Sequence, residues 1–361
     1  MRATRASRSR NLNPKAKEKA ESAQDWRSEV ESGDHAPIHL ARSRAREEGR
    51  GREATTPSEI PARGWRDILV RVVWALPEDR VLSTAGGVAF FALLSVFPAL
   101  ATVVSLYGLF SDAASIPGHL ALLDGLVPDG VLLLVAQELT RVASQRTDAL
   151  GFAFTTGLAI ALWSANSGVA ALFDALNVVY REREKRSLLR FYATTFLFTL
   201  GGIVFMLSAV GAVVVLPVAL GLLGMATQAE RVVSILRWPL LLLAIMAALA
   251  LVYRFGPSRR LAKWRWVSWG SAVAALLWIA ASMLFSWYVA SFDSYNRVYG
   301  SLGAGIGFVT WIWISAVIVL AGAELNAEME HQTAMDTTRG RPKPLGIRGA
   351  VVADTVGEAQ D

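Results

Sequence analysis

Six long apolar runs constrain the fold of this chain more than any other feature. A helix needs roughly 20 apolar residues to cross about 30 Å of hydrocarbon, and a segment in lipid must satisfy its backbone hydrogen bonds internally. The fourth run is short but within the usual range. We therefore expect an all-α, polytopic membrane protein with six transmembrane helices, near residues 86–110, 149–173, 192–219, 238–255, 267–290 and 301–323.

The composition agrees with a membrane protein that carries polar ends. Only 18% of the 361 residues are charged, whereas soluble proteins have about 25%. Residues 1–80 hold 17 of the 36 lysines and arginines, so the rest of the chain is poorer still in charge. A net charge of +6 is explained by the excess of lysine and arginine that membrane proteins carry in their cytoplasmic loops. We therefore expect no specific nucleic acid as a partner.

Metal and cofactor chemistry has no support in the sequence. The chain has no cysteine, which excludes disulfides, thiolate metal sites and cysteine nucleophiles. We expect no metal and no cofactor, because no zinc constellation can be drawn from the four histidines, His35, His39, His119 and His331.

Two terminal segments frame a membrane domain at 61–330. Residues 1–60 are rich in Arg, Ser and Glu and lack hydrophobic periodicity. Such a segment buries too little apolar surface to offset the entropy of ordering it. We expect disordered cytoplasmic tails at 1–60 and 331–361.

Residues 63–76 have a different pattern, with apolar side chains at helical spacing. Arg66, Asp67 and Arg71 take another face of the same helix. This pattern predicts an amphipathic helix on the membrane surface before the first span, with an apolar face of Trp65, Ile68, Leu69, Val72, Val73 and Leu76.

Basic residues in the connections predict the orientation. The second and fourth connections, together with Arg254 at the end of the fourth run, hold ten lysines and arginines, and the other three connections hold five. Basic loops lie in the cytoplasm, so six spans put both termini there. The outer connection 111–148 holds two short apolar stretches split at 128–130, which predict interfacial helices on the outer leaflet.

A stripe of small residues begins the sixth run. Gly300, Gly303 and Gly307 lie on one side of the expected helix. Small residues let membrane helices approach closely, so we expect these glycines to pack against another helix. In the first run, Pro98 removes one backbone hydrogen bond and predicts a kink.

Polar residues gather near the cytoplasmic ends of three expected spans. We hypothesise a polar cluster in which Arg254 pairs with Asp174 or Glu324; the alternative is that each residue is hydrated separately. Residues that are polar or ionisable inside spans are functional candidates. The members of the cluster are Asn166, Asp174, Asn177, Arg254, Glu324 and Asn326.

A second polar patch lies in the outer turn before the sixth run. It either lines a mouth between the fifth and sixth helices or forms a tight interfacial loop. Its members are Asp293, Tyr295, Asn296, Arg297 and Tyr299.

Several of these segments resemble the YihY/virulence factor BrkB family, which older usage calls the ribonuclease BN family. The resemblance covers about residues 64–330. The closing Gly-Ala-Glu-Leu-Asn and the Tyr-Gly-Ser-Leu-Gly run before it are its most specific parts. The resemblance implies a bacterial inner-membrane protein with six helices, and it rests on AGGVAFFALLSVFPALATVVSLYGLF, ALFDALNVVYREREKRSLLRFY and the stretch from VYRFGPSRR to GAELNAE.

The ribonuclease label is not supported by the residues. RNA cleavage needs a metal-binding cluster or a positioned acid–base pair. This sequence has scattered carboxylates and no histidine in any span, so we expect no catalytic residue and no enzyme.

Two function classes remain. One is the transport or handling of a lipid or other amphipathic substrate, with membrane lipids as partners. The other is a non-catalytic scaffold that binds a membrane protein or a second copy of itself. A groove open to lipid beside Asn166 and Gly303 favours the first class, and a dry, close-packed bundle favours the second.

Overall fold

The structure is a computed structural model that describes residues 35–110, 147–212, 228–291 and 301–360. Within these ranges the chain is helical and has no named strand. Six of the described helices are long and apolar enough to span a membrane, which confirms the predicted fold class. Their apolar segments are Val81–Ala99, Phe154–Val179, Leu188–Ala209, Ile235–Phe255, Trp264–Tyr288 and Gly305–Gln332.

Several of these helices extend beyond the predicted apolar runs. Polar residues at a span's end continue the backbone hydrogen bonding, although hydropathy no longer marks them. The largest extensions are at the start of the fourth helix, which begins at Gln228 rather than 238, and at the end of the sixth helix, which continues past 323 to Gln332. The helices are α4 Val81–Phe110, α7 Thr147–Val179, α8 Leu188–Val210, α10 Gln228–Phe255, α11 Trp264–Ser291 and α13 Ser301–Gln332.

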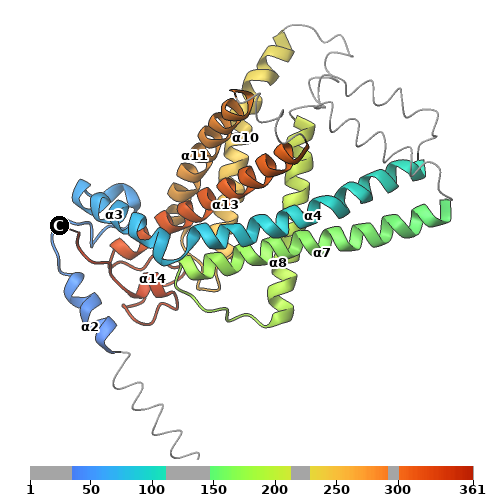
Figure 1. Ribbon diagram of the computed structural model, residues 1–361. Coiled ribbons are helices and arrows are strands. Elements are labelled where there is room, and N and C mark those ends of the chain that lie inside the picture. The colour runs from blue at the N-terminus through green and yellow to red at the C-terminus, as the bar shows by residue number, and fades with distance from the viewer. Residues whose placement is uncertain (1–34, 111–146, 213–227, 292–300, 361) are drawn as a thin grey trace, which may run out of the picture.

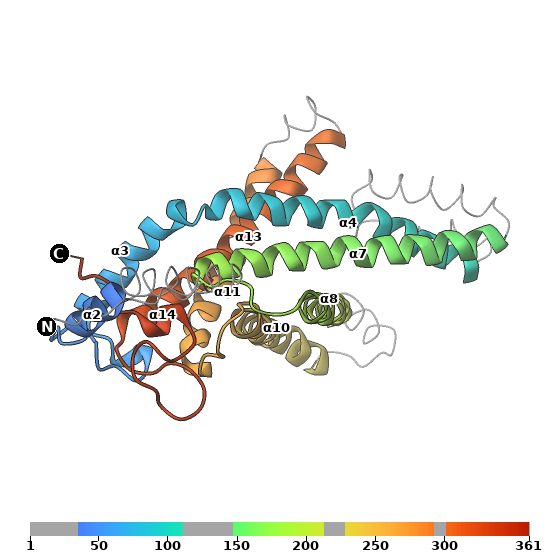
Figure 2. The ribbon, with the colours of Figure 1, turned by 90° about the horizontal axis from the view of Figure 1, so that it is seen from below.

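Helix α13 is the central element of the bundle. Helices α4 and α7 lie side by side in both views (Figures 1 and 2), and α13 packs against this pair. On its other side α13 packs against α11, which contacts α10, while α8 contacts α7. The core at these contacts contains Phe173, Leu176, Tyr253 and Leu320, none more than 1% exposed.

The closest helix approach is between α11 and α13 at Gly270 and Gly322. A Cβ added at Gly270 would collide with the carbonyl oxygen of Gly322. A Cβ added at Gly322 would lie 2.6 Å from the Cβ of Ala274 and 2.6 Å from the hydroxyl of Tyr253. Small residues at this crossing thus bring the two backbones together.

Of the predicted glycine stripe, only Gly307 has described surroundings. A Cβ added at Gly307 would lie 3.9 Å from the ring of Phe285 on α11, which is an ordinary van der Waals distance, so the predicted close packing of this stripe stays a prediction. Gly303 begins α13 but its surroundings are not described, and Gly300 lies outside the described residues. Helix α13 packs tightly against α11 near its C-terminal end, where the two helices cross at Gly270 and Gly322.

Other predictions fall outside the described residues or stay untested. The expected outer helices at 111–148 lie almost wholly outside the described ranges, and so do Asp293, Tyr295, Asn296, Arg297 and Tyr299. Pro98 lies within α4, which continues as one helix to Phe110. The kink at Pro98 stays a prediction.

The described parts of both tails are ordered, which differs from the expected disorder. Helix α2 His35–Arg44, the turn η1 Pro57–Glu59 and helix α14 Val351–Asp354 form in them. These elements gather with α3 Ala62–Glu78 at one end of the bundle (Figure 1). Composition missed this order because polar contacts between the tails add to the burial of a few apolar side chains, among them Ala54, Ile60 and Val352.

Helix α3 has the predicted amphipathic character, but its polar side is turned inward. Leu69, Val73 and Trp74 are 54–65% exposed, while Asp67 and Arg71 are buried. An exposed apolar face on a helix next to the first span fits a position in the membrane interface. The buried charges instead bind the tails.

We expect Gly322→Leu to destabilise the bundle by about 1–3 kcal/mol, the usual cost of overpacking. Gly305→Leu is the matched control on the same helix, because a Cβ there meets nothing within 4 Å. Thermal unfolding in detergent measures both. Equal midpoints for the two variants contradict the assigned α11–α13 crossing.

Candidate functional site

The last turns of α13 carry a buried polar segment, which we call the α13 terminus. Its side chains are almost fully enclosed, which excludes the alternative that Glu324 and Asn326 are hydrated separately. They are covered by the C-terminal tail and by the basic loops after α7 and α10. The members of the α13 terminus are Glu324, Asn326, Glu328, Glu330 and Gln332, none more than 3% exposed.

The strongest contact of the α13 terminus is a two-pronged ion pair between Arg259 and Glu330. The Nη2–Oε1 distance is 2.5 Å and the Nη1–Oε2 distance is 3.1 Å, and both side chains are 0% exposed. Thr337 donates a further hydrogen bond to Glu330, and the guanidinium lies 4.1 Å from the ring centre of Tyr180. Burial lowers the pKa of Arg259, but the Glu330 carboxylate reverses this effect and raises it.

A second buried pair joins α13 to α3. Arg71 Nε donates to Glu328 Oε2 at 2.5 Å, and Arg71 Nη2 donates to Gln332 Oε1 at 2.6 Å. The guanidinium also donates to the carbonyl of Glu358 in the C-terminal tail. The surface helix α3 is therefore fixed to both α13 and the tail.

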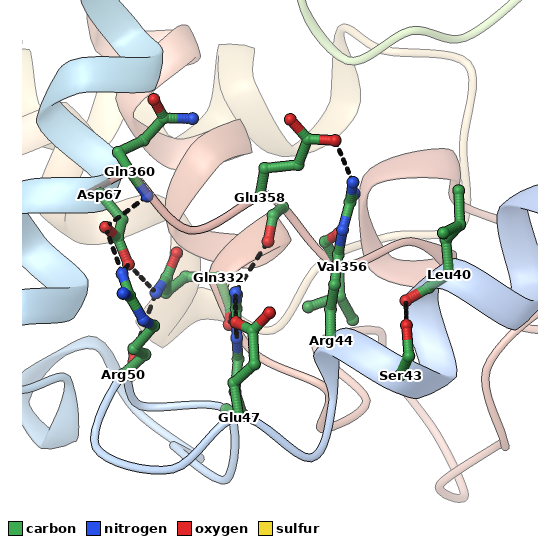
Figure 3. A network of polar contacts seen from close by, with 12 residues as sticks. Leu40, Ser43, Arg44, Glu47, Arg50, Asp67, Gln332, Val356, Glu358 and Gln360 are labelled. Carbon is green, nitrogen blue, oxygen red and sulfur yellow. Dashed lines mark hydrogen bonds and ion pairs between the residues drawn. The ribbon is translucent and has the colours of Figure 1, made fainter.

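The two tails are bound to each other by similar contacts (Figure 3). Asp67 accepts hydrogen bonds from Arg50 at 2.9 Å and from the backbone N–H of Gln360 at 2.9 Å, while Arg44 pairs with Glu358. Burial alone would raise the pKa of Asp67, but these donors hold it below its usual range.

A pair of carboxyl groups lies between α3 and α13. Asp79 follows α3, and its carboxyl faces that of Glu324 closely enough to share a hydrogen bond. Such a bond requires one of the two groups to carry a proton. Burial raises the pKa of Asp79, and the nearby charges of Glu78 and Glu328 add to this effect, while Glu324 and Arg181 oppose it.

The polar cluster predicted from the sequence does not form one site. Asn166 accepts a 3.4 Å hydrogen bond from Thr199, which joins α7 to α8. Asn326 accepts one from the backbone N–H of Gly270 at 2.9 Å, which supports the α11–α13 crossing. These two residues hold separate helix contacts.

Asn177 links two loops at the C-terminal end of α7. It accepts a 2.7 Å hydrogen bond from the backbone N–H of Ser258 and donates one of 3.1 Å to Glu184. Burial would raise the pKa of Glu184, but hydrogen bonds from Arg186 and Asn177 lower it to about 2. The loops after α7 and α10 are therefore bound to each other.

The predicted ion pairs of Arg254 are wrong. Asp174 is exposed, and Glu324 faces Asp79 instead. The guanidinium of Arg254 lies on the ring of Trp264, 4.2 Å from its centre. The helix ends share one side of the bundle as expected, but side-chain direction brings other residues together.

Sequence reasoning missed the residues that organise this region. No role was predicted for Arg259, Glu328, Glu330 or Arg348, yet all four side chains are buried. Arg348 donates to the backbone carbonyls of 334, 335 and 353. A signal was present, because a span that ends in three glutamates next to arginine-rich loops indicates buried ion pairs.

A groove of about 1110 Å³ lies between α8 and α10. Apolar and small side chains form its walls, among them Phe198, Gly201, Gly202, Ala248 and Leu251. A Cβ added at either glycine meets nothing within 4 Å, so the two glycines leave this wall open.

One end of the groove is basic. Lys185, Arg186, Arg190, Arg259 and Arg260 line it. Arg186 and Arg259 are neutralised by carboxylates, and Lys185 pairs with Glu182 at 2.7 Å. No ion pair is found for Arg190 or Arg260 among the described residues, so this end is suited to an anionic group.

Comparison with known proteins gives a consistent classification. The model of the family described as Virulence factor BrkB matches residues 73–345. A Bacillus subtilis protein named "Putative ribonuclease-like protein YfkH" is 30% identical over 256 residues, which are 68% of this chain and 88% of that protein.

Other relatives carry a membrane-protein name. A "UPF0761 membrane protein" of Vibrio campbellii is 30% identical over 271 residues, 71% of this chain and 81% of its own length. One from Ralstonia nicotianae is 30% identical over 260 residues, 70% of this chain and 56% of its own length. No solved structure matches the chain.

We expect Asp79→Asn to remove a pH dependence of stability. The folded state raises the pKa of Asp79 above its ordinary value of 3.8. The stability that the proton on Asp79 contributes is therefore complete below pH 3.8 and is lost as the pH rises through the raised pKa. Asparagine stays neutral, so the variant should unfold at a higher temperature than wild type near neutral pH and at an equal temperature below 3.8.

Unfolding midpoints across pH in detergent measure this difference. Glu53→Gln is the control, because Glu53 is exposed, its substitution removes the same charge, and it does not contribute to the pKa of Asp79. A variant that keeps the wild-type pH profile excludes Asp79 as the titrating group.

Proposed function

The chain belongs to the virulence factor BrkB family, and from this premise we propose that it is an integral membrane protein that binds and moves a lipid or other amphipathic molecule. The groove between α8 and α10 is the observation that carries the proposal. A single-tailed or two-tailed lipid needs apolar walls for its chains and a polar end for its headgroup. The groove supplies both.

The size of the groove supports such an occupant. Pockets for small ligands have volumes of about 300–1,000 Å³, and this groove holds about 1110 Å³. Its walls are helices whose neighbouring faces are exposed and apolar, with Val204 on α8 63% exposed and Leu243 on α10 59% exposed. A lipid can therefore enter sideways from the bilayer without crossing water.

The basic end of the groove supports an orientation in the membrane. Arg190 and Arg260 belong to the loops with the excess of lysine and arginine, which is the cytoplasmic side under the positive-inside rule. The headgroup then lies at the inner leaflet of a bacterial cytoplasmic membrane. Both termini lie on that side as well.

The proposed role is not enzymatic. The relative in Bacillus subtilis carries a ribonuclease-like name, but the buried carboxylates here are held in other roles. Glu328 and Glu330 are bound by Arg71 and Arg259. A carboxylate fixed by an arginine is a poor general base, because the ion pair lowers its proton affinity.

The groove also revises which residues carry the function. A groove beside Asn166 and Gly303 was the feature that favours lipid handling; Asn166 does not line the groove found here, and the surroundings of Gly303 are not described. Asn166 instead supports the α8 wall of the groove from α7, because it accepts a hydrogen bond from Thr199 on α8. The competing occupant is a second copy or another membrane protein, as the scaffold class requires.

We expect Gly201→Trp to fill the groove and reduce bound lipid by about tenfold or more, equal to about 1.4 kcal/mol of binding free energy. Folding should be spared, because a side chain at Gly201 enters open space. Native mass spectrometry of protein purified in mild detergent measures the lipid-bound fraction.

Val204→Trp is the matched control on α8. Val204 is 63% exposed and does not line the groove. It should retain the wild-type amount of lipid. The proposal is contradicted if the wild type and Gly201→Trp carry equal amounts of lipid. It is also contradicted if the folded wild type copurifies with another protein but with no lipid.

A further inference from the structure

The guanidinium of Arg254 is buried without an ionic or hydrogen-bonding partner in the part of the chain that the structure describes. The residue is 4% exposed, and neither Nε nor Nη1 reaches an acceptor. Its contacts are aromatic: the ring centres of Trp264 and Phe255 lie 4.2 Å and 5.7 Å from the guanidinium carbon.

Aromatic contact alone leaves this charge poorly compensated. An arginine cannot lose its proton in a protein, so it must be buried as a cation. A ring face stabilises a cation but accepts no hydrogen bond from the guanidinium edges. A buried cation is normally matched by an anion as well.

The charged neighbour of Arg254 is another arginine. Arg339 acts on it as a like charge, and no carboxylate contributes to its electrostatic surroundings among the described residues. The backbone N–H of Arg339 donates to the carbonyl of Leu261 at 2.8 Å, which fixes Arg339 beside the loop after α10. Its side chain is exposed and makes no described hydrogen bond or ion pair.

The nearest carboxylates of these segments are already occupied. Glu330 is bound by Arg259, and Asp336 accepts three hydrogen bonds from Thr338 and the backbone N–H of Lys343. Neither is free to turn toward Arg254. No carboxylate of the described residues supplies the missing negative charge, which points to a bound anion.

We propose that Arg254 and Arg339 bind a phosphate group, with the ring of Trp264 as one wall of the site. Two guanidiniums match the several oxygens of a phosphate and form charge-assisted hydrogen bonds to it. Arg254 ends the apolar segment Ile235–Phe255 and Trp264 begins the next one. Tryptophan at a span's end is typical of the headgroup level of the bilayer.

This phosphate site is separate from the groove. Leu251, Val252 and Phe255 line the groove, whereas Arg254 and Trp264 do not. Arg254 faces α11 instead. The inference therefore does not depend on the proposed function, and the groove-filling variant Gly201→Trp should keep the phosphate site intact.

The test measures the unfolding midpoint of the full chain in two settings. One is detergent with and without inorganic phosphate, against chloride at equal ionic strength. The other is a phosphate-free maltoside detergent with and without added phosphatidylglycerol. A ligand that binds the folded state raises the midpoint.

We expect Arg254→Gln to lose the rise that the wild type shows. Without phosphate the variant should be at least as stable as wild type, because it removes an unpaired buried cation. Arg339→Gln should show a smaller rise than wild type. Arg341→Gln, an exposed neighbour with the same loss of charge, should respond as wild type does.

The two settings identify the source of the phosphate. A rise with inorganic phosphate indicates a free anion, and a rise with phosphatidylglycerol alone indicates a lipid headgroup; either supports the site. The proposal is overturned if neither raises the wild-type midpoint, or if Arg254→Gln responds as fully as wild type.

Discussion

The ion pair between Arg259 and Glu330 is the contact on which the polar side of this protein depends. Both side chains are fully buried, so each charge relies on the other. Removing one partner of such a pair costs about 3–5 kcal/mol, because the remaining charge is left uncompensated. The pair joins the loop after α10 to the end of α13, and Tyr180 after α7 packs on the same guanidinium.

The groove follows from this anchoring. Asn177 binds Ser258, and Arg186 donates to the carbonyls of Phe255 and Gly256, so the end of α10 and the start of α8 are held at one place. Away from that place α8 is attached to α7 rather than to α10, through Asn166 and Thr199. Helices α8 and α10, the two walls of the groove, are thus held together at one end and are separated along the rest of their length.

The same anchoring explains the ordered tails. Charged side chains of the tails bind to α3 and to the α13 terminus, where backbone groups would otherwise lack partners. Arg52 donates to the carbonyls of Gln332 and Gly357, at 3.0 Å and 2.8 Å. A composition that looks unable to fold alone can therefore be ordered when a membrane domain offers it a polar surface.

The sequence was sufficient for what depends on local pattern. Hydropathy located the six spans and helical spacing located α3, because both are properties of single segments. The closest helix contact was not predictable in this way, since Gly270 and Gly322 lie on different helices and either glycine alone looks ordinary. The predicted polar cluster was wrong for a related reason. Residues such as Arg254 lie at the same side of the bundle as their expected partners, but their side chains point in other directions.

An electron cryomicroscopy map of the full chain in lipid nanodiscs tests the groove most directly. The account predicts an elongated density between α8 and α10 that passes Gly201 and Ala248 and has its polar end near Arg190. Direct packing of α8 side chains on α10, or a second copy of the chain seated between them, would contradict it.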